Sequence, residues 1–200
     1  MPRKSRVAWI VAGCLIAIGG THAQQWPHYA ADQAASHYSP LDQITPANVG
    51  KLAIAWEWKP NEKILPQFGT RPGAFQNTPL MIDNVLYLST PYNQVAALDA
   101  TTGKEIWRYD PKAYEDGQPP NGQGFAHRGV AAWKDGDKLR IILNSRYRLI
   151  QLDAKTGEVV TSFGNKSSVS CTVKTPCTSW ASSVRTYGGI LTIKSGLPSE

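Results

Sequence analysis

The chain has 200 residues, with 21 lysines and arginines against 15 acidic residues and only three cysteines. Three of the basic residues lie among the first six positions, so the remainder carries 18 basic against 15 acidic residues, a net charge of +3. No basic patch interleaved with aromatic residues accompanies this small excess. The charge pattern therefore excludes a typical nucleic-acid-binding protein, and we expect no nucleic-acid partner.

The N-terminal segment, from Met1 to Ala23, has the order of a secretory signal. A basic start is followed by the apolar run Val7–Gly20 and by the small-residue site Thr21-His22-Ala23. This run is too short to span a bilayer. We expect cleavage after Ala23, export to the periplasm and at most peripheral membrane association. An alternative interpretation is lipidation of Cys14, although the apolar run continues past that cysteine.

Residues 24–51 are predicted to form an extended N-terminal arm, because Gln24–Pro46 is polar and has no sustained period. A strand is predicted at Leu52–Trp58, and a loop rich in proline and glycine follows from Pro60 to Gly73.

A repeated phrase dominates the rest of the chain. Ala97–Glu105, read ALDATTGKE, returns as QLDAKTGE at Gln151–Glu158, so the aspartate, threonine and glycine recur at one fixed spacing. Gly103 and Gly157 suit turn positions with positive φ. A repeat period of about 50 residues, with strands flanking each polar turn, is typical of the blades of a β-propeller.

The strand pattern predicts an all-β protein, a partial β-propeller with about two four-stranded blades over residues 52–164. The first blade is expected to contain Leu80–Ile82, Val85–Ser89, Gln94–Leu98 and Glu105–Tyr109. The second is expected to contain Gly129–Trp133, Leu139–Leu143, Arg148–Leu152 and Val159–Phe163.

The composition changes in the tail, residues 165–200. No acidic residue occurs from Lys166 to Ser199, and serine and threonine make up 13 of the last 36 positions. We interpret this segment as either a divergent blade or a frameshifted end. Cys171 and Cys177 are predicted to form a small loop disulfide or to stay unpaired, because further metal ligands are lacking nearby.

A series of motifs resembles the N-terminal part of the PQQ-dependent quinoprotein dehydrogenases. The matching pieces are Gln25-Trp26-Pro27-x-Tyr29, the stretch from Tyr38 to Leu52, Thr78-Pro79-Leu80, Ala97-Leu98-Asp99, Thr102-Gly103-Lys104-Glu105-x-Trp107 and His127-Arg128-Gly129-Val130. Their order and spacing run from about Gln25 to Gly164.

The resemblance implies an eight-bladed propeller that holds pyrroloquinoline quinone (PQQ) on its axis beside a calcium ion. It implies oxidation of a sugar or an alcohol by hydride transfer to the quinone, with ubiquinone or a cytochrome as the electron acceptor. In the family, the calcium ligands and the catalytic carboxylate lie in later blades. The resemblance therefore assigns no metal ligand and no catalytic residue to this chain, which we expect to be an incomplete and inactive N-terminal portion.

Two cofactor-binding residues follow from the resemblance. Arg128 matches the arginine beside the quinone oxygens, where a fixed cation stabilises developing negative charge. Gln76 stands where alcohol-oxidising members carry a glutamate that touches the cofactor. If both residues lie in a strand, His127 is expected to point to the opposite face from Arg128 and to be packed or solvent-facing rather than catalytic.

The repeated aspartates and the tryptophan are expected to serve the fold. Asp99 and Asp153 should hydrogen-bond the backbone of their own turns. Trp107 should pack between neighbouring blades, as the tryptophan of the family's docking motif does, whereas the second copy has Thr161 at that position.

The residues at two positions, six and five residues before Arg128, suggest the subgroup within the family. Alcohol dehydrogenases of the family have adjacent cysteines where this chain has Gly122 and Gln123, so the resemblance is nearer to the quinoprotein glucose dehydrogenases. Two alternatives remain: a non-catalytic propeller scaffold, such as the lipoprotein that helps to assemble outer-membrane proteins, and a truncated gene product.

Overall fold

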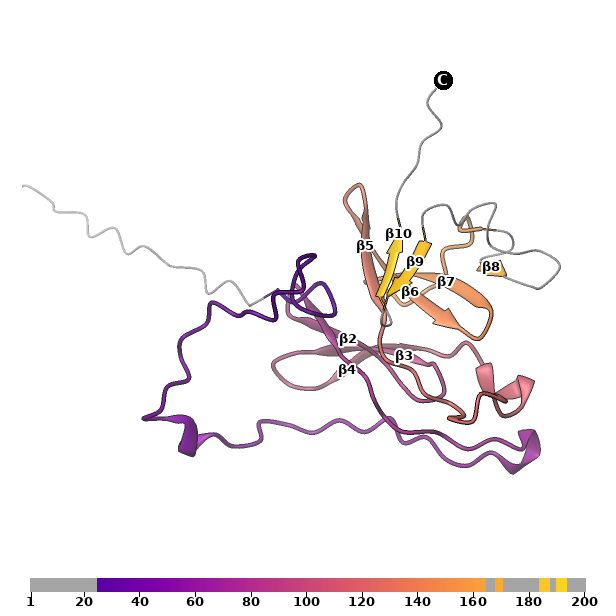
Figure 1. Ribbon diagram of the computed structural model, residues 1–200, viewed down its shortest axis with the longest axis horizontal. Coiled ribbons are helices and arrows are strands. Elements are labelled where there is room, and N and C mark those ends of the chain that lie inside the picture. Colours follow the sequence, from indigo (N-terminus) through magenta and orange to yellow (C-terminus); the bar gives the residue numbers. More distant parts are fainter. Residues whose placement is uncertain (1–24, 165–167, 171–183, 188–189, 194–200) are drawn as a thin grey trace, which may run out of the picture.

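The computed structural model describes residues 25–164, 168–170, 184–187 and 190–193 (Figure 1). The predicted signal, Cys14, Cys171, Cys177 and most of the tail lie outside the described residues. Within the described ranges, the regular structure consists of strands and short 3-10 helices, and no helix is long and apolar enough to cross a bilayer. The 3-10 helices are η1 (Val49–Lys51), η2 (Pro66–Phe68) and η3 (Ala113–Asp116).

The first sheet is a four-stranded antiparallel meander in the order β1-β2-β3-β4. Its strands are β1 (Leu80–Ile82), β2 (Val85–Ser89), β3 (Val95–Asp99) and β4 (Glu105–Tyr109). Asp83 and Asn84 both have positive φ in the turn between β1 and β2, as a two-residue hairpin loop requires. This confirms the predicted first blade, with one unforeseen irregularity. The register between β3 and β4 shifts so that Ile106 has no residue opposite.

The second sheet has the order β5-β6-β7-β8. Its strands are β5 (Ala131–Asp135), β6 (Lys138–Ser145), β7 (Arg148–Asp153) and β8 (Ser168–Ser170). A separate two-stranded sheet joins β9 (Val184–Tyr187) and β10 (Ile190–Ile193).

The predicted fourth strand of the second blade, Val159–Phe163, is wrong. Val159 forms only an isolated bridge to Leu152, and the strand that lies beside the other half of β7 is β8. The chain turns away after Val160, where Thr161 replaces the large aromatic side chain that Trp107 provides on β4. Without this apolar anchor, the segment has less to hold it flat against the sheet.

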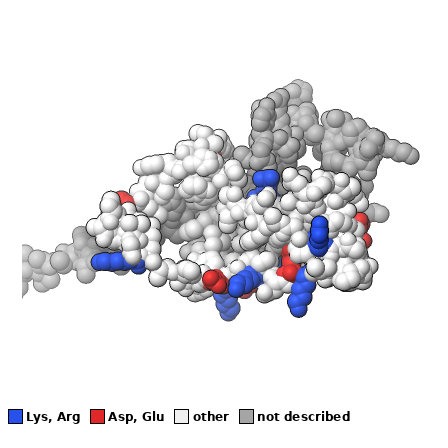
Figure 2. Space-filling view, turned by 60° about the horizontal axis from the view of Figure 1, so that its bottom comes forward, with Lys and Arg blue, Asp and Glu red and all other residues white. Residues whose placement is uncertain are grey.

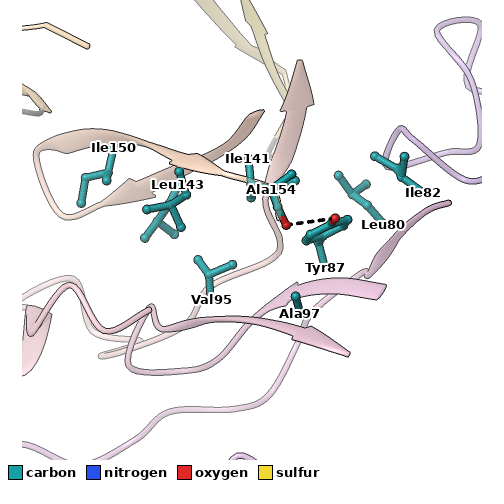
Figure 3. Packing of buried hydrophobic residues seen from close by; sticks show 10 residues of the cluster. Leu80, Ile82, Tyr87, Val95, Ala97, Ile141, Leu143, Ile150 and Ala154 are labelled. Carbon is teal, nitrogen blue, oxygen red and sulfur yellow. Dashed lines mark hydrogen bonds between the residues drawn. The ribbon is translucent and has the colours of Figure 1, made fainter. Parts of the chain in front are cut away.

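The main core lies between the two sheets (Figure 3). The side chains buried there come from both sheets: Leu80, Ile82, Tyr87, Val95, Ala97, Ile141, Leu143, Ile150, Leu152 and Ala154. The hydroxyl of Tyr87 crosses the interface and donates to the carbonyl of Ala154 at 3.2 Å. Because alternate residues of a strand face opposite sides, the neighbours of Val95 and Ala97 on β3 point to the far face of the first sheet.

That far face is covered by two tryptophans that follow the arm. Trp56 and Trp58 pack against Leu88, Ala96 and Leu98, while the residues around them are exposed. The predicted strand Leu52–Trp58 is therefore wrong as a strand. The segment is extended, but within the described residues it has no neighbouring strand, so the alternating pattern is present without the pairing.

Candidate functional site

Gln76 and Arg128 lie at equivalent places, just before the first strand of each sheet. Gln76 precedes β1 by four residues and Arg128 precedes β5 by three. The backbones of these two entrance segments are joined, because the N–H of Thr78 donates to the carbonyl of Arg128 at 3.1 Å. Both side chains are exposed and make no hydrogen bond or ion pair within the described part of the chain. The structure thus places both predicted residues on adjoining segments with their polar groups free.

A polar cluster lies next to this pair, with Ser89 buried and Asn77 and His127 half-buried. The Nδ1 atom of His127 is 2.7 Å from the hydroxyl of Ser89, and its Nε2 atom is 2.6 Å from the carbonyl oxygen of Asn144. The side-chain amide of Asn77 is 2.9 Å from the same hydroxyl, and its oxygen can accept from the N–H groups of Ser89 and Gly129. Residues on both sides of Arg128 are therefore tied to the sheets.

The hydrogen bonds fix the tautomer of His127. A backbone carbonyl only accepts, so the Nε2 atom that faces Asn144 carries the proton. The neutral ring then accepts at Nδ1 from the hydroxyl of Ser89. Burial lowers the pKa of His127 below its ordinary value, and the hydrogen bond to Asn144 opposes this shift. Of the two expected alternatives, packed or solvent-facing, His127 is packed, although neither His127 nor Arg128 lies in a strand.

The loop that carries Arg128 is held by an aromatic cluster. Phe125 is almost fully buried and meets Tyr92 edge to face at a centroid distance of 5.0 Å. Arg146 stacks over the ring of Phe125, 5.0 Å from its centroid, and its guanidinium donates to the carbonyls of Ala113 and Gly117. Sequence reasoning missed this cluster because its members are far apart along the chain.

The repeated aspartates serve their turns, as predicted. Asp99 accepts from the N–H groups of Thr101 and Thr102 at 3.0 and 2.7 Å and from the Thr102 hydroxyl. Asp153 accepts from the N–H groups of Lys155 and Thr156 at 2.9 and 3.3 Å. These hydrogen bonds, the side-chain bond of Thr102 first, lower the pKa of Asp99.

Trp107 packs between the sheets, which confirms its predicted role. Its indole N–H donates to the carbonyl of Ala154 at 2.9 Å. The ring covers Gly157 so closely that a Cβ on this glycine would lie 2.6 Å from the indole carbon Cε3. The glycine of the repeated turn is thus required for close approach as well as for its positive φ of 74°.

Trp56 occupies the corresponding place on the first turn, and sequence reasoning missed it. Its indole N–H donates to the carbonyl of Ala100 at 3.2 Å, and its ring lies over Gly103, where a Cβ would overlap it. The signal was present, since Trp-Glu-Trp-Lys-Pro at residues 56–60 parallels Trp-Arg-Tyr-Asp-Pro at residues 107–111.

Basic and acidic side chains are interspersed on the face that Figure 2 shows, with no broad patch of one sign. Within the described residues, no three or more histidine, cysteine, aspartate and glutamate side chains gather where they could hold a metal ion.

Each of the two adjacent four-stranded sheets contains one copy of the repeated phrase, and Trp107 packed on Gly157 joins the two sheets. This arrangement is a partial β-propeller. The sequence profile of the "PQQ: Glucose/ethanol/alcohol dehydrogenase, beta-propeller domain" family matches residues 26–192. The chain therefore belongs to this family of PQQ quinoprotein dehydrogenases.

Individual relatives support this membership. The dehydrogenase subunit of the quinone-type alcohol dehydrogenase of Gluconobacter oxydans is 37% identical over 70% of this chain and 17% of its own length. The quinoprotein glucose dehydrogenase of Escherichia coli is 34% identical over 75% of this chain and 20% of its length. The crystal structure of the quinohemoprotein alcohol dehydrogenase of Comamonas testosteroni superposes with a TM-score of 0.53 at 29% identity, covering 74% of this chain and 21% of that one. The chain thus spans about a fifth of these relatives.

Proposed function

We propose that this chain forms one arc of a periplasmic PQQ-dependent dehydrogenase that oxidises a sugar of the glucose type or an alcohol. Family membership and relatives of both substrate classes support this proposal. The two classes match at similar identity, so the nearness to glucose dehydrogenases rests on Gly122 and Gln123, which stand at the positions of the alcohol dehydrogenases' cysteines. Calcium, with its ligands outside this chain, and a quinone or cytochrome acceptor complete the proposed enzyme.

The observation that carries the proposal is the placement of Arg128 and Gln76. A free guanidinium and a free amide stand on hydrogen-bonded segments at the entrances of two adjacent sheets. This donor set fits PQQ, whose carboxylates and quinone oxygens are hydrogen-bond acceptors. When bound, the cofactor would supply the hydride acceptor.

The chain's own residues would bind and orient the cofactor. The guanidinium of Arg128 can make two parallel hydrogen bonds and brings a permanent positive charge. The amide of Gln76 can donate a further hydrogen bond without adding charge. The cluster of Asn77, Ser89 and His127 fixes the backbone next to Arg128, so that the Cα atom from which the side chain extends is held in place.

A chimaera tests the proposal. Residues 26–164 of this chain would replace the aligned part of the Gluconobacter oxydans subunit, and both PQQ affinity and dye-linked oxidation of glucose and ethanol would be measured. We expect PQQ binding to survive in the chimaera and to weaken on the change Arg128→Lys, because an ammonium cannot reproduce the planar contact. Arg71→Lys is the matched control, since Arg71 is also an exposed arginine in a loop. Equal PQQ affinity of the two lysine variants would refute the role of Arg128.

The proposed location is tested separately by mass spectrometry of the exported protein. The basic, apolar and small-residue order from Met1 to Ala23 supports cleavage after Ala23, which would leave Gln24 as the new N-terminus. A diacylated N-terminus at Cys14 would contradict this and would favour the lipoprotein interpretation.

A further inference from the structure

His127, Ser89 and Asn77 form a chain of hydrogen bonds whose protons can be counted. The Nε2 atom of His127 faces the carbonyl of Asn144 at 2.6 Å and therefore carries a proton in every state of the ring. The hydroxyl of Ser89 has one proton to donate, and it lies 2.7 Å from Nδ1 of His127 and 2.9 Å from the side-chain amide of Asn77. Ser89 is fully buried, so these two neighbours decide where its proton points.

In the neutral state of the ring, the hydroxyl of Ser89 donates to Nδ1 of His127. Nδ1 has a second donor in the N–H of Gly129, at 3.4 Å. The oxygen of Ser89 must then accept, so the amide of Asn77 turns its NH2 group towards it. This orientation also sets the NH2 group 3.0 Å from the backbone N–H of Ser89, so that two donors face each other. The neutral state therefore contains an unfavourable contact.

In the protonated state of the ring, the same contacts pair donors with acceptors. Nδ1 of His127 donates to the oxygen of Ser89, and the hydroxyl of Ser89 donates to the oxygen of a rotated Asn77 amide at 2.9 Å. That oxygen also accepts from the N–H groups of Ser89 and Gly129 at 3.0 and 3.3 Å. With a neutral ring, the same rotation would set the oxygens of Ser89 and Asn77 against each other. Protonation of the ring and rotation of the amide are thus coupled.

Rotation of the amide changes how the entrance segments of the two sheets are joined. In the neutral state, the N–H of Gly129 is bonded within its own segment, to His127. In the protonated state it is bonded across to Asn77, in addition to the backbone bond that already joins the segments at Arg128. The protonated state therefore holds Gln76 and Arg128 more firmly relative to each other.

We propose that His127 and Asn77 are positioning residues for the cofactor, and that PQQ is held with the ring doubly protonated and the amide rotated. The charge of the ring, one residue from Arg128, attracts the carboxylates of PQQ, and the second bond between the segments restrains the donors that bind them. The proposal rests on the proposed function, since PQQ must lie at Gln76 and Arg128. By linkage, PQQ binding then takes up a proton, and acid solution strengthens the binding.

The groups packed against His127 leave its charge to these hydrogen bonds. β2 contributes Ser89, β6 contributes Asn144 and the first entrance segment contributes Asn77, all of them uncharged. Arg128, the next residue, is charged, but its side chain is exposed. Burial lowers the pKa of His127, and the hydrogen bond to Asn144 acts in the opposite direction. Burial thus favours the neutral state in the free chain, and a bound anion would favour the protonated one.

Nitrogen NMR of the full chain tests the coupling without any cofactor. The chemical shifts of the ring nitrogens report which of them is protonated, and the signals lost in His127→Gln belong to that ring. Asn77→Asp supplies a charged acceptor and should raise the pKa of His127 by about one unit, whereas Asn77→Ala removes the acceptor and should lower it by about half a unit. Asn121→Asp is the matched control and should change this pKa far less, because Asn121 is exposed and bonds to its own loop.

The effect on the cofactor is measured in the chimaera proposed above. Between pH 8 and 5, we expect the Kd of PQQ to fall about tenfold more in the chimaera than in its His127→Gln variant. This factor corresponds to a rise of about one unit in the pKa of His127 on binding. Circular dichroism of each variant verifies its fold.

Opposite pKa changes in the two Asn77 variants, together with the steeper pH dependence of PQQ affinity, would support the proposal. An equal pKa of His127 in Asn77→Asp, Asn77→Ala and Asn121→Asp would overturn it. An equal pH dependence in the chimaera and its His127→Gln variant, with Arg128→Lys still weakening PQQ binding, would overturn it and leave the proposed function intact. If Arg128→Lys weakens binding no more than Arg71→Lys does, the proposed function fails, and the role of His127 in cofactor binding fails with it.

Discussion

Gly157→Ala probes the contact that joins the two sheets. Gly157 has a φ of 74°, a region that an L-residue enters at a cost of about 1–2 kcal/mol. The new Cβ would lie 2.6 Å from Cε3 and 2.7 Å from Cδ2 of Trp107, closer than ordinary van der Waals contact allows. The ring cannot move freely, because its N–H is bonded to Ala154 at 2.9 Å and its face is packed in the core. Overpacking of this kind costs about 1–3 kcal/mol more.

A matched glycine separates the two costs. Gly136 has a φ of 58°, but a Cβ there would meet nothing within 4 Å, so Gly136→Ala should show the backbone cost alone. In urea denaturation followed by circular dichroism, we expect Gly157→Ala to lower the free energy of unfolding by about 2–5 kcal/mol and Gly136→Ala by about 1–2 kcal/mol.

A double-mutant cycle tests whether the ring of Trp107 causes the additional destabilisation in Gly157→Ala. In a Trp107→Ala background the ring is gone, so Gly157→Ala should cost no more than Gly136→Ala does. If Gly157→Ala in the original chain destabilises it no more than Gly136→Ala, the docking of tryptophan on glycine does not hold the sheets together and the reasoning fails.

Four further outcomes are expected. Tyr87→Phe should cost only about 0.5–1.5 kcal/mol in urea denaturation, because the Ala154 carbonyl keeps its bond from Trp107; a larger loss would show that the Tyr87 hydroxyl does more. Because the pKa of His127 is lowered in the folded chain, the unfolded chain binds more protons as the pH falls. The contribution of neutral His127 to the free energy of unfolding is therefore full above about pH 6.5 and is lost as the pH falls towards the pKa in the folded state. Between about pH 7.5 and 5, the free energy of unfolding should depend less on pH in His127→Gln than in the original chain. An equal dependence on pH in both proteins would contradict this. Because the pKa of Asp99 is lowered in the folded chain, its ionised carboxylate stabilises the fold above about pH 3.9, and this stabilisation is lost in more acid solution. The free energy of unfolding should therefore fall less steeply with acid in Asp99→Asn than in the original chain. An identical fall in both proteins would argue against the hydrogen bonds of Asp99 to its turn. The 200-residue chain with calcium and PQQ should not oxidise glucose or simple alcohols in a dye-linked assay, because one arc cannot enclose the cofactor, and any turnover would refute this.

Local sequence accounted for most of the sheet structure. The alternation along Val95–Asp99, the turn residues and the repeated phrase predicted the strands of the first blade and three of the second. The repeated aspartates were predicted as turn residues because Asp-x-x-Thr-Gly satisfies its own backbone within five positions. Family motifs located Gln76 and Arg128 before the first strands of the two sheets. These properties are encoded over short stretches and need no knowledge of distant contacts.

The tertiary structure decided the features that depend on a neighbour far away in the chain. Leu52–Trp58 has the pattern of a strand, yet a strand also needs an adjacent backbone, and none of the described residues provides one. Likewise, the hydrogen bonds of His127 to Ser89 and Asn144 join residues that are 38 and 17 positions apart. Periodicity fixes which side of a strand a residue faces, but pairing and burial are set by what lies against that side.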